Sequence, residues 1–316
     1  MKYSLIIPVY NNESTIPLLL NEVSILNSKM SGKLEGVFVV DGSPDNSLKI
    51  LRELLEASNL NYQILVHARN FGSFAAIRTG LMAARGKFFA VMSADLQEPI
   101  SLISSFFEVL DKDHCDLAIG KRIDRDDPFF SKLASNTFWT LYRYFVMPEI
   151  PKGGVDVFGC NITARNTLLQ LEESHSSLVS LIFWMGFRKQ FIEFKRAKRP
   201  HGTSSWTWRK KLKYMMDSIF SFTDIPIKLI IRSGLIGLIL SVALGAIVLF
   251  ARIFYSIDVP GYATTIIVIL FFGVLNLLGI GLVGSYVWRT YENSKHRPHA
   301  IISMIYSNDP LIPLDD

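Results

Sequence analysis

The chain has 316 residues, of which 49% are hydrophobic, 12% aromatic and 19% charged, with a formal net charge of +5. The aromatic content and the 20 Gly and 13 Pro residues exclude a disordered or collagen-like chain. Soluble domains average about 25% charged residues, so the low charge and the length indicate one sizeable domain with additional apolar segments. Cys115 and Cys160 are too few for a disulfide framework and are expected to be free thiols. The apolar run within residues 1–10 is too short for a signal peptide.

Strand and helix patterns alternate along residues 1–195. Short apolar runs predict strands at 4–9, 36–40, 62–67, 87–92 and 116–119, and amphipathic runs predict helices at 14–28, 47–57, 73–85 and 99–110. This alternation indicates a mainly parallel α/β sheet with helices on both faces. The aromatic stretch 129–147 is expected to be helical, and either to pack in the core or to rest on lipid.

Two long runs, residues 234–251 and 263–288, contain no charged side chain. A helix needs about 20 apolar residues to cross about 30 Å of hydrocarbon, so each run can span a membrane. The link between them carries Pro260 and Gly261, which suit a turn. A helical hairpin buried in a soluble core is the alternative, but charge-free runs of this length are rare in soluble folds. We therefore expect two transmembrane helices within residues 233–288.

Basic residues flank these two runs. Eight Lys or Arg and no acidic residue lie between Lys195 and Lys213, and Arg289, Lys295 and Arg297 follow the second run. The positive-inside rule then predicts a plasma (bacterial inner) membrane protein with two spans, its soluble domain and both termini in the cytoplasm. Because the spans hold the basic cluster against the bilayer, anionic headgroups are its expected partner, and nucleic acid is not.

Three polar clusters follow predicted strands, at residues 8–13, 41–45 and 93–98. Each alone is compatible with a turn and a helix cap, but all three fall at the carboxyl ends of one sheet, where ligands bind in open α/β folds. In such a cluster, a carboxylate that follows an apolar strand, with a second oxygen ligand two residues further on, can hold a hard divalent cation. Such a cation would neutralise the charge on a nucleoside diphosphate leaving group.

Seven motifs occur in a fixed order along the chain. They are PVYNNE (8–13), VVDGSPDNS (39–47), RNFGSFAAIRTGL (69–81), SADLQEP (93–99), GKR (120–122), GGVDVF (153–158) and RPHGTSSW (199–206). With the paired spans and the closing RTYENSKHRPH, they make nearly the whole chain resemble the polyprenyl-phosphate glycosyltransferases of glycosyltransferase family 2, which include dolichyl-phosphate mannose synthases and bactoprenol glucosyltransferases. The resemblance implies a GT-A type (Rossmann-like) domain and an inverting transfer of one sugar from a nucleotide-sugar to a polyprenyl phosphate.

The resemblance also implies roles for individual residues. It places Pro8, Tyr10, Asn12, Asp41, Ser93, Ala94, Asp95 and Arg199 at the nucleotide-sugar. It implies that Asp95 and Gln97 are ligands of Mg²⁺ or Mn²⁺, and that Arg122 and Lys132 bind the phosphate of the acceptor. Asp156 falls in a motif on the acceptor side and would orient substrate, so that Asp95, Arg122 and Asp156 form the expected catalytic set.

The sequence departs from the family pattern at three positions. The usual acidic motif is Asp-Ala-Asp, and its first member here is Ser93, which predicts a weaker cation site or one completed by water, Gln97 and donor oxygens. Ser205 stands where a Lys is common, and Asn12 where an acid is common. These changes bear on metal affinity and on the donor more than on the class of reaction.

The expected organisation has four parts. They are a glycosyltransferase domain (1–195), a basic amphipathic juxtamembrane segment (196–232), a two-helix transmembrane hairpin (233–288) and a cytoplasmic tail (289–316). A processive polysaccharide synthase is one alternative, although the sequence lacks its Gln-x-x-Arg-Trp motif and its further spans. A non-catalytic membrane scaffold that binds nucleotide-sugars is the other, and Ser93 is the feature that favours it. A homo-oligomer is compatible with the resemblance.

Overall fold

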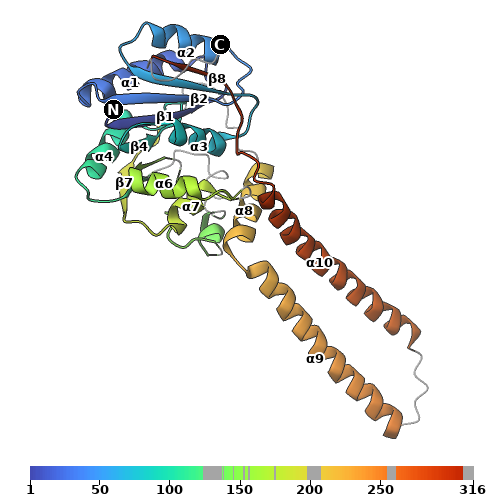
Figure 1. Cartoon of the computed structure of the whole chain (residues 1–316). Coiled ribbons are helices and arrows are strands. Elements are labelled where there is room, and N and C mark those ends of the chain that lie inside the picture. The colour runs from blue at the N-terminus through green and yellow to red at the C-terminus, as the bar shows by residue number, and fades with distance from the viewer. Residues whose placement is uncertain are drawn as a thin grey trace.

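The computed structural model describes residues 1–123, 137, 139–144, 146–151, 154–155, 157–173, 176–197, 208–254 and 261–308. Its strands are β1 (Tyr3–Val9), β2 (Leu34–Val40), β3 (Asn61–His67), β4 (Phe88–Val91), β5 (Leu117–Arg122), β6 (Phe158–Asn161), β7 (Lys189–Phe194) and β8 (Ile302–Ser307). Its helices are α1 (Ile16–Lys29), α2 (Ser47–Glu56), α3 (Ser73–Ala83), α4 (Ile100–Asp111), α6 (Ile162–Gln170), α7 (Leu178–Trp184), α8 (Trp208–Phe222), α9 (Ile225–Phe254) and α10 (Tyr262–Ser294). An α/β body carries a long projecting hairpin made of α9 and α10 (Figure 1).

The body is built on one eight-stranded sheet, in the order β7-β5-β6-β4-β1-β2-β3-β8. The β1–β2, β1–β4, β2–β3 and β5–β7 pairs are parallel, whereas β6 and β8 run antiparallel to their neighbours. The predicted mainly parallel α/β fold is confirmed, and the strands and helices predicted up to residue 119 are present within a few residues of their expected bounds.

Helices cover both faces of the sheet, because successive side chains of a strand point to opposite faces and both sets are apolar here. On β1, Leu5 and Ile7 pack with α1, α2 and α4, and Ile6 packs on the other face with α3, α6 and α7. All three side chains are fully buried. Two apolar cores therefore hold the sheet between helix layers, and they fix the strand ends from which the polar clusters extend.

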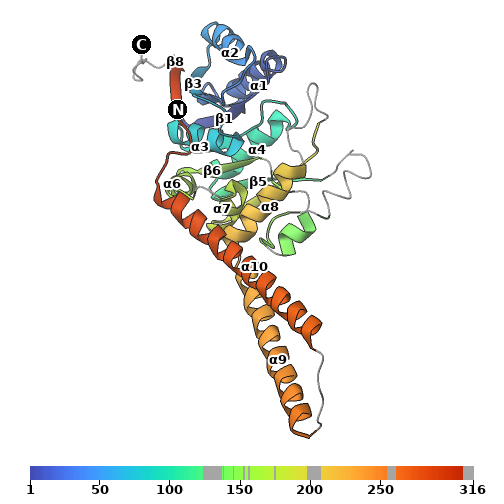
Figure 2. The ribbon, with the colours of Figure 1, turned by 90° about the vertical axis from the view of Figure 1, so that its right-hand side faces the viewer.

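Helix α8 joins the body to the base of the hairpin (Figure 2). Its Tyr214 ring stacks on the ring of Tyr142 at a centroid distance of 5.6 Å, and the Tyr214 hydroxyl lies 2.6 Å from the hydroxyl of Ser177. About one turn further along α8, Asp217 forms an ion pair of 2.7 Å with Arg289 of α10. The segment expected to lie on a membrane surface is thus also packed against the body.

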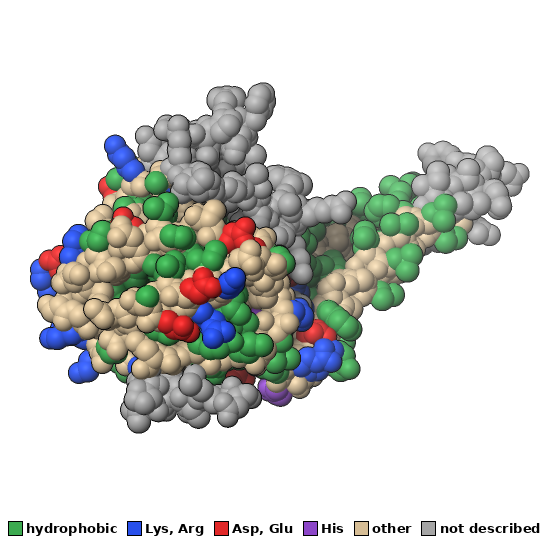
Figure 3. Space-filling view, turned by 90° about the horizontal axis from the view of Figure 1, so that it is seen from above, with side chains coloured by type: hydrophobic (Ala, Val, Ile, Leu, Met, Phe, Trp, Pro, Cys, Tyr) green, Lys and Arg blue, Asp and Glu red, His purple; other side chains and the backbone are tan. Residues whose placement is uncertain are grey.

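The hairpin is apolar and exposed. Segments Ile225–Ile247 and Val268–Ser294 have mean hydropathies of 2.1 and 2.2, and 6% and 0% of the residues in their most apolar stretches are buried. Seen from above, charged side chains of both signs are scattered over the body, whereas the described side chains along the hairpin are mainly apolar (Figure 3). This exposure argues against a hairpin buried in a soluble core, and both helices are long enough to cross a membrane.

The segment expected to be a cytoplasmic tail contains a strand that returns to the sheet. Strand β8 pairs antiparallel with β3, and the amide of Ala68 donates to the carbonyl of Ile301 at 2.9 Å. The Asn308 side chain accepts from the Tyr62 amide at 3.0 Å and donates to the Leu60 carbonyl at 2.9 Å. Figures 1 and 2 both show the chain running from the end of α10 to this sheet edge. The hairpin is therefore attached to the body at both of its ends.

Truncation after Ala300 is expected to destabilise the body. It removes the β3–β8 ladder and the packing of Ile302 and Ile305 against the core, a loss of about 3 kcal/mol. In a domain of about 200 residues this corresponds to a Tm lower by about 6–12 °C, measurable by thermal unfolding in detergent. Truncation after Asn308 is the matched control and should leave Tm unchanged. Equal Tm values for the two truncations would show that β8 does not stabilise the body.

Candidate active site

Loops from neighbouring strands meet at the carboxyl edge of the sheet. The loop after β1 bonds to the loop after β2, with the Asn11 amide donating to Ser43 Oγ at 2.8 Å and the Glu13 amide donating to Asp45 Oδ2 at 3.0 Å. It also bonds to the loop after β4, because Thr15 Oγ1 donates to the Ala94 carbonyl at 3.0 Å. The three polar clusters predicted to form one site thus lie together.

The residues expected to bind the nucleotide differ in how far their side chains are exposed at this edge. Pro8 is half-buried at the end of β1, Tyr10 is 42% exposed, and Ala94 is buried. The Asn12 side chain accepts from the Tyr10 amide at 2.9 Å, so it shapes the first loop. Tyr10 is the member of this group whose ring is open to a ligand.

Asp41 is almost fully buried and orders the loop after β3. Its Oδ1 accepts from the amide of Phe71 and lies 2.8 Å from His67 Nδ1, and its Oδ2 accepts from the amide of Gly72 at 2.8 Å. Burial raises the pKa of Asp41, but the hydrogen bonds from His67, Phe71 and Gly72 outweigh it and leave the pKa lowered. Since His67 Nε2 also lies 2.9 Å from Thr79 Oγ1, the His67 ring connects Asp41 to α3.

Gly42 lets the loops after β2 and β3 approach closely. Its φ is +58°, and a Cβ at this position would lie 2.4 Å from the backbone carbon of Arg69 and 2.5 Å from the backbone nitrogen of Asn70. Any side chain here would be strained by the backbone angle and would push the two loops apart. The close approach explains the glycine in the DGSPD motif.

The loop after β4 places two carboxyl groups around one hydroxyl. Ser93 Oγ donates to Asp95 Oδ1 at 2.8 Å and makes a short hydrogen bond with Glu98 Oε2. Glu98 is 2% exposed, and burial and the nearby charge of Asp95 raise its pKa, against the lowering effects of Ser93, Arg196 and Arg122. The sequence reasoning included Glu98 in this cluster without giving it a role.

The backbone of this loop is held in a costly conformation. Leu96 has a φ of +57°, a left-handed geometry that residues with a Cβ rarely adopt. The next amide, that of Gln97, points to Asp95 Oδ1 at 3.3 Å. Strained residues of this kind concentrate at functional sites, where the surrounding structure holds them.

Gln97 contacts a basic residue from a distant segment. Its side-chain oxygen accepts a short hydrogen bond from the Arg196 guanidinium, and its carbonyl accepts from the Ala197 amide at 2.9 Å. Sequence reasoning assigned Arg196 to the cluster beside the bilayer, because nothing in the spacing reveals that it folds back onto the loop after β4. The structure thus adds Arg196 to the site.

Arg122 ends β5 and lies at the same edge of the sheet. It is 9% exposed, and its charge acts on Glu98. Three other residues expected in the site, Lys132, Asp156 and Arg199, lie outside the described residues. The structure therefore brings Asp95, Gln97 and Arg122 together around Glu98.

Comparison with known sequences assigns the chain to a family. The pattern of the family described as glycosyl transferase family 2 matches residues 4–214. The chain belongs to this family. It is 30% identical over 303 residues to the bactoprenol glucosyl transferase of Shigella phage SfV, covering 96% of this chain and 98% of that protein. It is also 29% identical to the prophage bactoprenol glucosyl transferase homolog of Escherichia coli, with 96% and 99% covered. The chain is therefore a glycosyltransferase, as the sequence predicted.

Comparison with solved structures supports the GT-A type fold. The mannosyltransferase PcManGT from Pyrobaculum calidifontis, solved with GDP-Man and Mn²⁺, aligns with a TM-score of 0.50 and 18% identity. The alignment covers 70% of this chain and 63% of that chain. At this identity the likeness concerns the fold alone.

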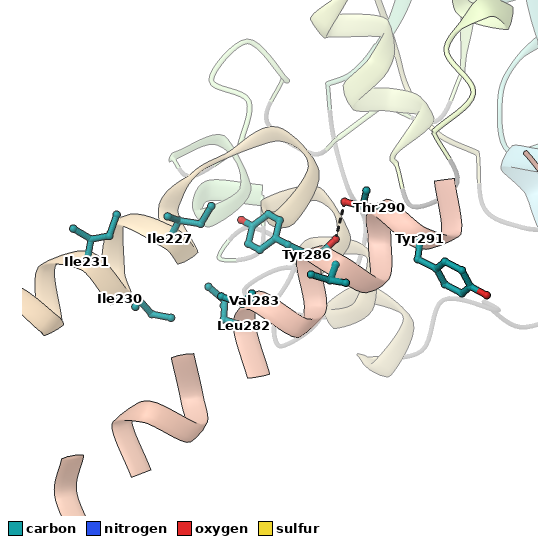
Figure 4. A pocket seen from close by; sticks show the side chains of 9 residues that line it. Ile227, Ile230, Ile231, Leu282, Val283, Tyr286, Thr290 and Tyr291 are labelled. Atoms are coloured by element: carbon teal, nitrogen blue, oxygen red, sulfur yellow. Dashed lines mark hydrogen bonds between the residues drawn. The ribbon is translucent and has the colours of Figure 1, made fainter. Parts of the chain in front are cut away.

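The glycosyltransferase has an apolar groove of about 640 Å³ at the base of its hairpin. The groove is lined by Ile227, Ile230, Ile231, Leu282, Val283, Tyr286, Val287, Thr290 and Tyr291. Figure 4 shows Ile227 and Ile230 of α9 facing Leu282, Val283 and Tyr286 of α10. The Tyr286 hydroxyl is buried, with no hydrogen-bond partner among the described residues. The groove thus combines apolar walls with one buried polar group.

Proposed function

We propose that this glycosyltransferase moves one sugar from a UDP- or GDP-sugar to a polyprenyl phosphate, on the cytoplasmic face of the membrane and with inversion at the anomeric carbon. The observation that carries the proposal is the junction, in one chain, of a polar site at the carboxyl edge of the sheet with an apolar hairpin. Its similarity over 96% of its length to a bactoprenol glucosyl transferase supports a polyprenyl phosphate as acceptor.

The donor would bind across the loops after β1, β2 and β4. The exposed Tyr10 ring offers a surface for a base, and the loops ordered by Asp41 and Gly42 form the wall beside it. Ligands of open α/β sheets occupy this crevice. Arg199 would contact the donor diphosphate.

The residues after β4 fit a divalent cation such as Mg²⁺ or Mn²⁺. Asp95 provides a carboxylate, Gln97 an amide oxygen and Glu98 a buried carboxylate oxygen, Oε1, with no hydrogen-bond partner among the described residues. Oxygen donors of this kind are what these hard cations bind. When bound, the cation would supply charge neutralisation to the diphosphate leaving group.

The reaction needs no strong general base. A phosphate monoester has its second pKa at about 6, so at pH 7 its oxygen is already an anion. That oxygen attacks the anomeric carbon, and the bond from this carbon to the diphosphate oxygen breaks with its electron pair, releasing the nucleoside diphosphate. Arg122, with Lys132, would hold the acceptor phosphate by charge-assisted hydrogen bonds, and Asp156 would orient substrate. Positioning of this kind contributes up to about 7–11 kcal/mol.

The orientation of the chain follows from its two attachments. Because α9 starts beside α8 and the chain after α10 joins the sheet as β8, a hairpin that crosses the membrane leaves both ends on the side of the catalytic body. Lys228, Arg232, Arg289 and Lys295 lie at this end. The positive-inside rule supports a cytoplasmic location for the body and both termini.

The groove at the base of the hairpin would hold the first isoprene units of the acceptor. Filling it by Val283→Trp is expected to raise the KM for a long-chain polyprenyl phosphate about tenfold, with little change in kcat. The reason is that displacing about 60 Å² of apolar contact costs about 1.5 kcal/mol. Steady-state kinetics with varied acceptor measure the effect.

Val274→Trp is the matched control for that substitution. It lies on the same helix, is 58% exposed and does not line the groove. An equal KM for the two variants would show that the acceptor chain binds elsewhere.

A donor screen tests the proposed activity. The purified chain in detergent is incubated with Mg²⁺, a polyprenyl phosphate and single UDP- or GDP-sugars, and release of nucleoside diphosphate is followed. The proposal expects release with at least one donor that depends on the lipid phosphate. Absence of release with every donor would favour the non-catalytic scaffold.

A further inference from the structure

The acidic motif after β4 has one carboxylate fewer than is usual in the family that this chain resembles, because Ser93 stands at its first position. The structure shows a different carboxyl group at this place. Ser93 Oγ contacts Asp95 Oδ1 at 2.8 Å and also makes the short hydrogen bond with Glu98 Oε2. One hydroxyl therefore bridges the carboxyl groups of Asp95 and Glu98.

The environment of Glu98 leaves part of its carboxyl group unsatisfied. The residue is 2% exposed, and its Oε1 is buried without a hydrogen-bond partner in the described part of the chain. A buried carboxylate oxygen without a partner is costly, so such groups normally bind a cation or a donor. In addition, Ser93 has a single hydroxyl proton and cannot donate to two carboxylates at once.

The nearby arginines do not supply the missing hydrogen bond to Glu98 Oε1. The charges of Arg122 and Arg196 act on Glu98, yet neither side chain donates a hydrogen bond to it among the described contacts. Arg196 instead donates to the side-chain oxygen of Gln97. A cation with oxygen ligands would satisfy the buried Oε1 of Glu98, which lies beside a second carboxylate, that of Asp95.

The local backbone explains how Glu98 reaches this place. The left-handed Leu96 turns the chain immediately after Asp95, and the Gln97 amide then points back to Asp95. The turn sets Glu98 beside Ser93, five residues earlier in the sequence. The left-handed conformation of Leu96 thus brings the Glu98 carboxyl group next to Ser93.

We propose that Glu98 supplies the second carboxylate of the divalent-cation site, in place of the aspartate that Ser93 replaces. The site then comprises Asp95, Glu98, the Ser93 hydroxyl and Gln97, and its two carboxylates balance the charge of a divalent cation. The inference rests on the proposed metal-assisted transfer. It explains how a chain with Ser93 keeps a cation site.

The test is Mn²⁺ binding by the full-length chain in detergent, read from the electron paramagnetic resonance signal of free Mn²⁺. Glu98→Gln keeps the shape of the side chain and removes its charge. We expect it to weaken Mn²⁺ binding by about 10–100-fold, the range seen when groups that support a metal site are lost. Glu108→Gln, an exposed acid paired with Lys112, is the matched control and should bind like the parent chain.

A second pair of variants tests whether charge at this place is what matters. Ser93→Asp restores the usual carboxylate, and in the Glu98→Gln background it is expected to return Mn²⁺ affinity to the parent value. The single variant Ser93→Asp, which keeps Glu98, should bind Mn²⁺ more tightly than the double variant Ser93→Asp/Glu98→Gln. If Glu98→Gln by itself does not fold, the comparison of Ser93→Asp with the double variant decides the question.

Two results would overturn the inference. One is an unchanged Mn²⁺ affinity on replacing Glu98 in both backgrounds, and the other is a parent chain that does not bind Mn²⁺. Because the readout uses neither donor nor lipid, it is separate from the proposed function. A chain that binds Mn²⁺ through Glu98 but forms no sugar lipid would contradict the proposed function and leave the cation site standing.

Discussion

Asp95→Asn is expected to lower kcat for sugar transfer by about 10²–10³-fold, the range seen when one group that stabilises transition-state charge is removed. The Asp95 carboxyl accepts from Ser93 Oγ and from the Gln97 amide through the same oxygen, and an asparagine can keep both hydrogen bonds. The substitution therefore removes a charge and preserves the loop. The measurement is the initial rate of nucleoside diphosphate release at saturating donor and acceptor, with Tm recorded alongside.

The matched control for this prediction is Asp111→Asn. Asp111 is a surface carboxylate that bonds Lys2 and Tyr3, far from the loop after β4. It should leave kcat unchanged. Full activity of Asp95→Asn, or undiminished activity of the parent chain in excess chelator, would contradict a metal-assisted transfer.

Arg122→Ala is expected to reduce kcat/KM for the polyprenyl phosphate by about 10²-fold or more, while the Kd of the donor stays nearly constant. A guanidinium can make two hydrogen bonds to one phosphate, and losing a buried charged contact of this type costs about 2–5 kcal/mol. Arg122→Lys keeps the charge but loses the paired geometry, so it should fall between the parent and the alanine variant. Acceptor kinetics and donor binding by calorimetry separate the two effects.

Lys121→Ala provides the control on the same strand. Lys121 precedes Arg122, and its ammonium pairs with Glu193 at 2.8 Å at the surface. Its loss should leave both substrates unaffected. A variant at Arg122 that loses the donor but retains the acceptor would reverse the assignment of this residue.

Local patterns were sufficient to predict the strands and helices up to residue 119. The run GVFVV is fully buried, and KFFAVM is buried from Phe89 onward, in the interior of a mainly parallel sheet, so their composition alone identifies them as strands. The polar clusters after β1, β2 and β4 could be placed together because the carboxyl ends of parallel strands share one edge. These are the parts in which residues close in sequence determine the structure.

Long-range pairing could not be predicted in the same way. The partner of β8 lies more than two hundred residues earlier, and its residues, ISMIYS, have the mixed polarity of an edge strand within an apparent tail. The contact of Arg196 with Gln97 likewise joins segments 99 residues apart, and a basic cluster beside a membrane segment gives no sign of it. In both cases the structure depends on where the sheet and the hairpin bring distant segments together.

Glu98 illustrates the same limit within a single motif. Its position in SADLQEP was visible, but its burial and its bond to Ser93 depend on the left-handed Leu96, which no sequence rule predicts for a leucine. The family resemblance pointed to Gln97 instead. The backbone turn, and not the spacing, selects the carboxylate that faces Asp95.

Mass spectrometry of the lipid product tests the account most directly. The full-length chain, reconstituted with a polyprenyl phosphate and the donor found in the screen, should convert the lipid to a species heavier by one sugar residue, with one nucleoside diphosphate released per lipid. A series of products carrying several sugars would identify a processive synthase. An unmodified lipid, together with sugar transferred to water or to protein, would contradict the assignment of the acceptor.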